Sequence, residues 1–236
     1  MSILCKDKKC YLTRTINLNS MTIGERYNST IEYFQKIFPV AETELKYGDP
    51  FELLVAVILS AQCTDKRVNM ITPPLIEKFP DAESMSKAEP EDIFEYIKSC
   101  TYPNNKAKHL KGMSQMLVSE FGGIVPSEPE LLQRLPGVGR KSANVIASVI
   151  FRKPVMAVDT HVFRVSNRIG LVKNAKTPLS VELQLTRHIP VEMIHEAHHW
   201  LILHGRYTCK ARNPLCNKCG LSDFCNYYRK NRNKQK

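Results

Sequence analysis

Apolar residues recur at every third or fourth position along much of this chain, which is the spacing of one face of an α-helix. Ile31, Phe34 and Phe38 form the first such face. The apolar stretch 51–61 is longer than most strands and lacks alternation, so it also predicts a helix. The sequence contains no internal repeat, no low-complexity linker and no convincing strand pattern. We therefore expect an all-α fold.

Capping residues, prolines and glycines predict where several helices begin and end. Asp49 before a proline opens the second helix, and Asp65 is expected to cap a third, which Pro73–Pro74 should end or kink. Gly122–Gly123 closes a later long helix, and Ser127–Glu130 has the spacing of a capping box. The remaining helices are expected to begin near Arg140, Thr160, Pro178 and Val191.

Length and composition add limits on the class of protein. The chain has 236 residues, enough for one or two domains with a buried core, and 43% of them are hydrophobic. No apolar stretch reaches the ~18 residues of a membrane span, and the N-terminus lacks the apolar segment of a secretion signal. We therefore expect an intracellular protein whose cysteines are thiols or metal ligands, not disulfides.

The net charge of +11 is distributed very unevenly. Residues 1–20 contribute +3 and residues 209–236 contribute +7, so the 188 residues between them are nearly neutral. Within that middle part, residues 131–181 hold nine basic side chains and a single carboxylate, Asp159. A basic chain of this kind raises nucleic acid as a partner, and the isolated carboxylate is a candidate for chemistry.

Four of the eight cysteines cluster near the C-terminus with the spacing of a metal site. They are Cys209, Cys216, Cys219 and Cys225, with six, two and five residues between successive members. Four thiolates suit either structural zinc or an iron–sulfur cluster, and ligand type alone does not decide between them. The scattered cysteines, which we expect to take no part in the site, are Cys5, Cys10, Cys63 and Cys100.

A glycine-containing hairpin in Leu135–Asn144 has the features of a phosphate-binding element. Gly137 and Gly139 allow a tight turn and bring backbone N–H groups close to an anion. The next helix presents its unpaired N–H groups and positive dipole end to the same place. With Arg140 and Lys141 at the helix start, we expect a nucleic-acid backbone contact; the alternative is a turn that uses glycine for geometry alone.

Lys141 has two interpretations, a clamp for phosphate or a nucleophile. An amine attacks carbon only when it is unprotonated, and a free lysine has a pKa near 10.4. A helix N-terminus lowers a lysine pKa only slightly, so a nucleophilic Lys141 needs a partly buried pocket or a nearby base. Composition alone favours the clamp.

Asp159 begins a predicted helix and could serve both as its N-cap and as a catalytic carboxylate. A carboxylate beside a sugar can stabilise a developing positive charge or accept a proton from Lys141 or water. A permanent ion pair would raise the lysine pKa, so the catalytic interpretation requires proton transfer between the two groups.

The chain resembles the endonuclease III family of DNA base-excision glycosylases over roughly residues 25–228. Three motifs occur in the family's order: LPGVGRKSAN at 135–144, AVDTHVFRV at 157–165 and the four-cysteine motif. SAQCTD at 60–65 and HHWLILHGRYTC at 198–209 also match. By this resemblance, two helical domains flank a DNA-binding cleft, with a helix–hairpin–helix motif and a C-terminal loop that holds a [4Fe–4S] cluster on the four clustered cysteines.

The resemblance also implies a division of the chain into segments. A six-helix domain with the helix–hairpin–helix is expected at 43–153. A discontinuous helical domain with the cluster is expected at 21–42 and 154–228. Residues 1–20 are expected to be a disordered extension, and residues 229–236 a basic tail.

The activity implied by the resemblance is that of a bifunctional enzyme, which removes oxidised pyrimidines from DNA and then cleaves the abasic site. The residue matching Lys141 attacks the sugar C1′ of an everted nucleotide, and the Schiff base permits β-elimination 3′ to that site. The residue matching Asp159 assists the attack. This implication reverses the preference for a clamp and makes Lys141 the favoured nucleophile.

The DNA-binding residues implied by the resemblance, or favoured by their position, are Gln62, Tyr102, Gly137, Gly139, Arg140 and His161. Gln62 corresponds to a residue that fills the gap left by the everted base. Tyr102 stands where the family has an apolar wedge, and it departs from the leucine-containing form. An aromatic ring there could stack on the orphan base instead.

Two alternatives to the bifunctional enzyme stay open. One is a monofunctional mismatch glycosylase in which Lys141 only holds phosphate, and the other is a non-catalytic iron–sulfur DNA-binding protein. We expect a monomer that binds double-stranded DNA containing a damaged base or an abasic site, in the cytoplasm and at the nucleoid. Side chains expected to pack in the core instead of binding metal or substrate are His195, His198, His199, His204 and Trp200.

Overall fold

The computed structural model describes residues 21–232, and every regular element in that range is helical. Residues 1–20 and 233–236, which include the expected N-terminal extension and half of the expected basic tail, lie outside the described residues. Within 21–232, no helix has both the length and the apolar character needed to span a membrane. The helices are α1 (Ile23–Ile37), α2 (Pro50–Ser60), α3 (Asp65–Lys78), α4 (Ala82–Lys87), α5 (Pro90–Ile97), α6 (Pro103–Phe121), α7 (Pro129–Leu132), α8 (Arg140–Phe151), α9 (Thr160–Ile169), α10 (Pro178–His188), η1 (Val191–Met193), α11 (Ile194–Tyr207), η2 (Cys216–Lys218) and α12 (Asn226–Arg232).

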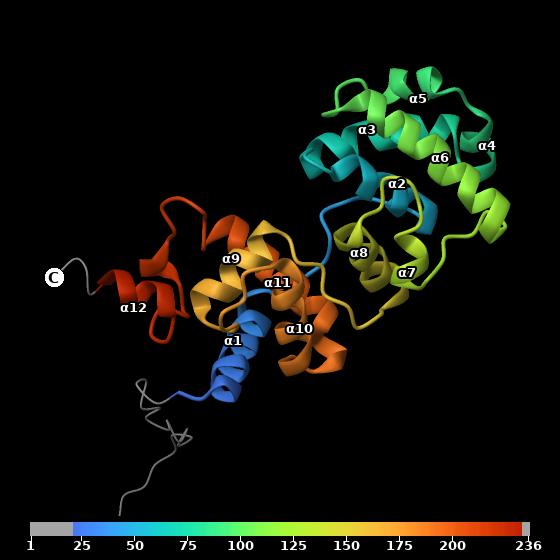
Figure 1. Cartoon of the computed structure of the whole chain (residues 1–236). Helices are drawn as coiled ribbons and strands as arrows, with labels where there is room; N and C mark the ends of the chain where they lie inside the picture. The colour runs from blue at the N-terminus through green and yellow to red at the C-terminus, as the bar shows by residue number, and fades with distance from the viewer. Residues whose placement is uncertain (1–20, 233–236) are drawn as a thin grey trace, which may run out of the picture.

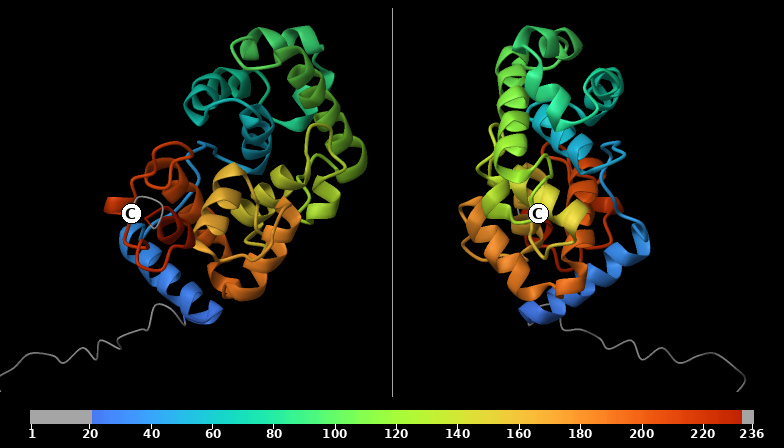
Figure 2. Two further views of the ribbon diagram at one scale, coloured as in Figure 1. Left: turned by 60° about the vertical axis from the view of Figure 1, so that its left-hand side comes forward. Right: turned by 90° about the vertical axis from the view of Figure 1, so that its right-hand side faces the viewer.

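The helices pack into two lobes (Figure 1). The first lobe contains α2 to α8, and its buried apolar residues, all between 45 and 149, form one cluster. The second contains α1 and α9 to α12, and its buried apolar residues come from 27–41 and 156–224. The N-terminal helix therefore shares a core with the C-terminal helices, and Figure 2 shows it beside them. The exact domain limits given above stay a prediction.

The helix α2 is the centre of the first lobe. Every apolar residue from Phe51 to Leu59 is buried. A helix that is apolar on all sides is stable only where other elements cover it, and α3, α6 and α8 pack around this one. Its predicted start is confirmed, because Asp49 Oδ1 accepts a hydrogen bond of 2.8 Å from the backbone N–H of Glu52.

The second lobe is completed by the apolar face of α1. Phe34 is buried, and its ring packs against that of Trp200 on α11. Trp200 Nε1 donates to the carbonyl oxygen of Phe38 at 3.0 Å. The hydroxyl of Tyr27 donates to the carbonyl oxygen of Leu171 at 2.9 Å. These buried polar bonds satisfy the amphipathic aromatic side chains and fix the start of the chain against its end.

The expected N-cap of α3 is wrong, and of the two alternatives for Pro73–Pro74, an end or a kink, the end is excluded. Thr64, not Asp65, is the N-cap, since its hydroxyl accepts a hydrogen bond from the backbone N–H of Arg67. The helix does not end at Pro73–Pro74 but continues through both residues to Lys78. Both prolines are exposed.

The expected capping box before α7 is not formed. Glu128 is the N-cap, and Pro129 occupies the first helical position. The hydroxyl of Ser127 donates instead to Glu128 Oε1 at 3.2 Å. A proline at the first position favours this start because its ring already fixes the helical φ.

Candidate active site

The hairpin between α7 and α8 leaves the N-terminus of α8 uncovered. Gly137 has a φ of +82°, which favours glycine, and a Cβ there would lie 3.0 Å from the Cβ of His109. Gly139 is the N-cap, with an ordinary φ of −86° and no side-chain cap. Nothing lies within 4 Å of the position of a Cβ on Gly139. The first N–H groups of α8 are therefore open to an anion.

Lys141 and Asp159 line the same pocket between the two lobes. Lys141 lies in the first turn of α8, and its side chain is exposed. Asp159 is the N-cap of α9 in the other lobe. Residues 42–45, α2, α3 and α11 complete the wall. The structure thus brings together the two residues that the sequence predicted to be catalytic.

The carboxylate of Asp159 divides its two oxygens between different surroundings. Its Oδ1 accepts hydrogen bonds from the backbone N–H groups of His161 and Val162, both at 2.8 Å. Its Oδ2 accepts no hydrogen bond from residues 21–232. One oxygen caps the helix and the other stays available, so capping and proton transfer are compatible at this residue.

Two buried histidines form the wall of the pocket on the α11 side. Burial, and to a smaller extent the charge of Lys141, lower the pKa of His198 to about 3. Burial and neighbouring positive groups lower the pKa of His199 to about 2. Both rings are therefore neutral near pH 7, and neither is an effective proton acceptor. On this side of the pocket the two rings therefore add no positive charge near the lysine.

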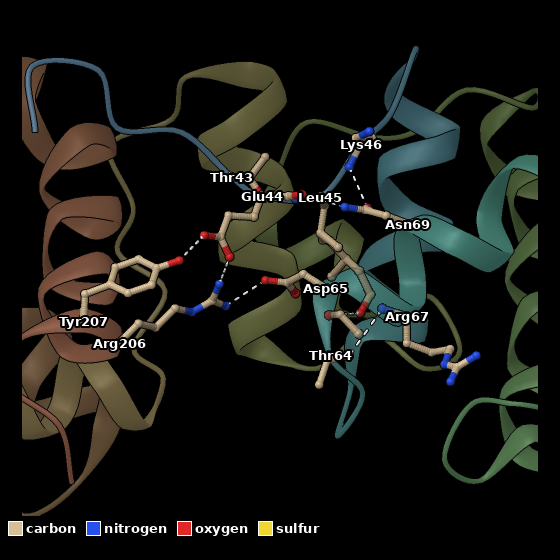
Figure 3. Close-up of polar contacts among 12 residues, drawn as sticks. Thr43, Glu44, Leu45, Lys46, Thr64, Asp65, Arg67, Asn69, Arg206 and Tyr207 are labelled. Atoms are coloured by element: carbon tan, nitrogen blue, oxygen red, sulfur yellow. Dashed lines mark hydrogen bonds and ion pairs between the residues drawn. The ribbon is translucent and has the colours of Figure 1, made fainter.

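An ion-pair network at the rim of this pocket connects the lobes (Figure 3). Arg206 of α11 contacts Glu44 in the segment that crosses between the lobes. Its Nη2 also lies 2.7 Å from Asp65 Oδ2 at the start of α3. The hydroxyl of Tyr207 donates to Glu44 Oε1 at 2.9 Å. One guanidinium group thus pairs with two carboxylates of the pocket and joins α11 to α3.

Gln62 and Tyr102 lie on adjacent loops outside the pocket. Both have positive φ, 55° and 52°, which is uncommon for residues other than glycine. The hydroxyl of Thr101 donates to the carbonyl oxygen of Gln62 at 2.7 Å and so joins the two loops. Both side chains are exposed, Tyr102 by 64%. The structure brings these two predicted residues together, while their contact with DNA stays a prediction.

Arg140 and His161 both make contacts within the protein. The guanidinium of Arg140 donates to both carboxylate oxygens of Glu182, at 3.0 and 2.8 Å, and thereby ties α8 to α10. His161 packs against Gly205, because a Cβ added to Gly205 would lie 2.8 Å from the Cβ of His161. Its Nδ1 lies 3.1 Å from Arg164 Nη2. These contacts explain the positions of both side chains, and their role in DNA binding stays a prediction.

The four clustered cysteines line one pocket between α9, the end of α11 and the start of α12. Among residues 21–232, no three His, Cys, Asp or Glu side chains converge as ligands of a single metal ion. Four thiolates that line one pocket suit a [4Fe–4S] cluster, which offers each thiolate a separate iron. Arg168 Nη1 lies 3.6 Å from Cys209 Sγ and can offset negative charge there. The donor set fits a cluster.

The remaining described cysteines lie elsewhere, as expected. Cys63 and Cys100 are next to Gln62 and Thr101, and their Sγ atoms are 3.6 Å apart. Cys5 and Cys10 lie outside the described residues.

Sequence reasoning missed part of the pocket wall. Asp65, His198 and Arg206 belong to stretches that the resemblance had marked, SAQCTD and HHWLILHGRYTC. Asp65 was expected to cap a helix and His198 to pack in the core, but none of the three was expected to line the pocket. Glu42 and Glu44 lie in a segment with no motif, and only the fold places them beside Lys141. A tertiary contact of this kind leaves no local signal in one sequence.

Two family models match the chain. A model described as "HhH-GPD superfamily base excision DNA repair protein" matches residues 55–190, and "Iron-sulfur binding domain of endonuclease III" matches residues 209–225. Endonuclease III of Rickettsia conorii is 48% identical over 201 residues, which cover 85% of this chain and 95% of that relative. The second match places a [4Fe–4S] cluster in the C-terminal region.

Solved structures show the same fold. A trapped endonuclease III–DNA covalent intermediate superposes with a TM-score of 0.85 at 40% identity, covering 90% of this chain and all of that one. A thermostable thymine-DNA glycosylase superposes with a TM-score of 0.78 at 26% identity, covering 88% of this chain and 97% of that one. The two family models and the long match at 48% identity agree with these structures. The chain therefore belongs to the endonuclease III family of HhH-GPD base excision DNA repair proteins.

Proposed function

We propose that Lys141 is the nucleophile of this enzyme and that Asp159 is the carboxylate that assists it. The chain is a bifunctional base excision repair enzyme, a DNA glycosylase and abasic-site lyase. One observation supports the assignment of residues most strongly. An exposed lysine and an aspartate with one uncommitted oxygen line the same pocket, next to the open N-terminus of α8.

The geometry supports the following order of events. A DNA phosphate binds the free N–H groups at the start of α8, and the damaged nucleotide turns out of the stack toward the pocket. Asp159 Oδ2 accepts a proton from Lys141 Nζ, which then attacks the sugar C1′ while the base leaves with the electrons of the glycosidic bond and takes up a proton. The C1′–O4′ bond then breaks, O4′ takes a proton as the sugar ring opens, and the nitrogen of Lys141 forms the Schiff base with C1′. The Schiff base acidifies the C2′ proton; when a base removes it, a C2′–C3′ double bond forms and the C3′–O3′ bond to the 3′ phosphate breaks. Asp159 Oδ1 keeps its two helix-cap bonds throughout.

The cluster is placed away from this chemistry. We propose Cys209, Cys216, Cys219 and Cys225 as its ligands, because they line one pocket. When bound, the cluster supplies four iron–thiolate bonds that fix the loop 209–225 to the end of α11. Arg168 holds the start of this loop, because its guanidinium donates to the carbonyl oxygens of Lys210 and Ala211.

We further propose that the substrates are oxidised pyrimidines and abasic sites in double-stranded DNA, and that one chain acts alone. Sodium borohydride trapping over a panel of damaged duplexes tests the substrates, and the native mass of the protein–DNA complex in solution tests whether one chain acts alone. We expect an adduct with thymine glycol and abasic duplexes, with the mass of one chain per DNA.

A lysine variant tests the assignment of the nucleophile. We expect Lys141→Gln to abolish borohydride trapping on an abasic duplex while DNA binding persists, because glutamine keeps a polar side chain but has no amine to form a Schiff base. Lys176→Gln is a matched control, since this exposed lysine does not line the pocket, and it should trap like the wild type. Base release without any wild-type adduct would favour the monofunctional mismatch glycosylase. Binding without either reaction would favour a non-catalytic DNA-binding protein.

A further inference from the structure

We infer that Lys106 is a positioning residue, whose buried ammonium group holds the loops of Gln62 and Tyr102 in one arrangement so that both side chains enter DNA together. The inference rests on the proposed function, because it takes Gln62 and Tyr102 as the residues that fill the gap left by an everted nucleotide. Lys106 is buried and does not line the pocket of Lys141. Its effect is on the register of the inserted side chains.

The ammonium group of Lys106 is fully used within the protein. Lys106 lies in the first turn of α6 and is only 5% exposed. Its Nζ donates to the carbonyl oxygens of Leu59 and Ala61, both at 2.8 Å, and lies 3.4 Å from Thr101 Oγ1. An ammonium group has three protons, and these three acceptors account for all of them.

The stability of α6 alone does not explain a lysine at this position. The helix dipole disfavours a positive charge in the first turn and favours one at a helix C-terminus. The side chain of Lys106 crosses to the C-terminal end of α2, where the last carbonyl groups have no partner within the helix. An apolar side chain would fill the site without the cost of burying a charge. What the ammonium group adds is a fixed link between two backbone segments.

The linked segments have conformations that require such a link. Five residues other than glycine within 21–232 have positive φ, and Gln62 and Tyr102 are two of them. Backbone strain of this kind concentrates at functional sites and persists only where the surroundings enforce it. Thr101 completes the connection, because its hydroxyl donates to the carbonyl oxygen of Gln62 at 2.7 Å and lies beside Lys106 Nζ.

The functional consequence depends on the DNA. In a duplex, an everted nucleotide leaves a gap and an orphan base, so Gln62 and Tyr102 must enter at fixed positions. A single-stranded abasic site has no opposite base and no intact stack, so the lyase reaction there needs neither side chain. Loss of Lys106 should therefore slow the reaction on duplex DNA selectively.

The test compares Lys106→Met with Lys108→Met, an exposed lysine on the same helix, in the iron-loaded full-length enzyme. Single-turnover rates are measured on a thymine glycol duplex and on a single-stranded abasic oligonucleotide. For Lys106→Met we expect the duplex rate to fall about tenfold, the equivalent of one lost stacking contact, with the single-strand rate within about twofold of wild type. Lys108→Met should leave both rates near wild type.

A second variant covers the case in which Lys106→Met does not fold. Thr101→Val replaces a hydroxyl with a methyl group at an exposed position. We expect the single-turnover rate of this variant to fall about threefold on duplex DNA only, a smaller loss than for Lys106→Met. Equal losses on both substrates, or no loss on duplex DNA, would overturn the positioning role. Absence of a borohydride adduct in the wild type would instead overturn the proposed function, so the two failures are distinguishable.

Discussion

Asp159 is the residue at which structure and chemistry can be separated by a single substitution. Asparagine caps a helix about as well as aspartate, so Asp159→Asn should change the free energy of unfolding by less than about 1 kcal/mol. The same change removes the proposed proton acceptor from the pocket that Lys141 lines, so we expect the trapping rate to fall by roughly 10²–10⁴. Urea unfolding and single-turnover trapping measure the two effects on one protein.

Alanine at the same position provides the contrast. Asp159→Ala loses the two cap bonds as well, and should cost a further ~0.5–2 kcal/mol of stability. If Asp159→Asn trapped DNA as fast as the wild type, Asp159 would be a structural residue only, and another carboxylate of the pocket, such as Glu42, would become the candidate.

The buried histidines predict how stability depends on pH. His199 has its pKa lowered from 6.5 to about 2, first by burial and then by His198, His195, Arg152 and Arg206. As the pH falls below 6.5, the unfolded chain takes up a proton that the folded chain does not, so stability decreases toward acid pH.

A variant isolates this contribution from all other titrating groups. We expect the free energy of unfolding of His199→Leu to fall less steeply with decreasing pH than that of the wild type, by up to ~1.4 kcal/mol per pH unit. Urea unfolding between pH 4.5 and 6.5 measures the difference in free energy of unfolding between the two proteins. The contributions of the carboxylates and of the cluster are the same in both and cancel in this difference. Parallel curves for the two proteins would mean that His199 takes up a proton in the folded state.

At the scale of the element, the hairpin before α8 separates a glycine required by the fold from one required by the ligand. Gly137→Ala would place a Cβ in a left-handed conformation and against His109, so it should cost about 2 kcal/mol of stability. Gly139→Ala meets no atom within 4 Å and should cost less than about 1 kcal/mol, the difference between glycine and alanine at an N-cap.

For DNA affinity the order should be reversed, with Gly139→Ala losing more than Gly137→Ala. A methyl group on Gly139 would occupy the place where a phosphate approaches the N–H groups of α8. We expect Gly139→Ala to weaken duplex binding at least about fivefold, or ~1 kcal/mol, measured at fixed salt. Equal affinity of Gly139→Ala and wild type would show that phosphate binds elsewhere and that the hairpin uses this glycine for geometry.

The same scale shows why helix positions were predictable and some of their ends were not. Asp49 and Gly122 cap helices through their own backbone neighbours, so the local sequence determines the result. Asp65 looked like a cap, but its carboxylate pairs with Arg206 and the neighbouring threonine caps the helix. Pro73–Pro74 does not end α3, because the buried residues on either side keep the helix packed against α2.

At the scale of the whole molecule, the chemistry was predictable where it lies in motifs and not where the fold assembles it. Lys141, Asp159 and the clustered cysteines each belong to a short pattern with a physical meaning of its own. Glu44 and Arg206 are far apart in the chain, and only the packing of the two lobes brings them together beside the pocket. The basic termini, which hold most of the net charge, gave no information about this assembly.

Because Lys141 and Asp159 belong to different lobes, the separation of their side chains depends on the contacts that join the lobes. Arg206 provides such a contact to Glu44 and Asp65, so Arg206→Met should loosen it and slow single-turnover excision about tenfold, since small misplacements are costly. Tyr207→Phe removes one hydrogen bond to Glu44 but keeps the link, and should stay within about twofold of wild type. Equal rates for the two variants would show that the lobes hold the pocket without Arg206, through the pair of Arg140 with α10.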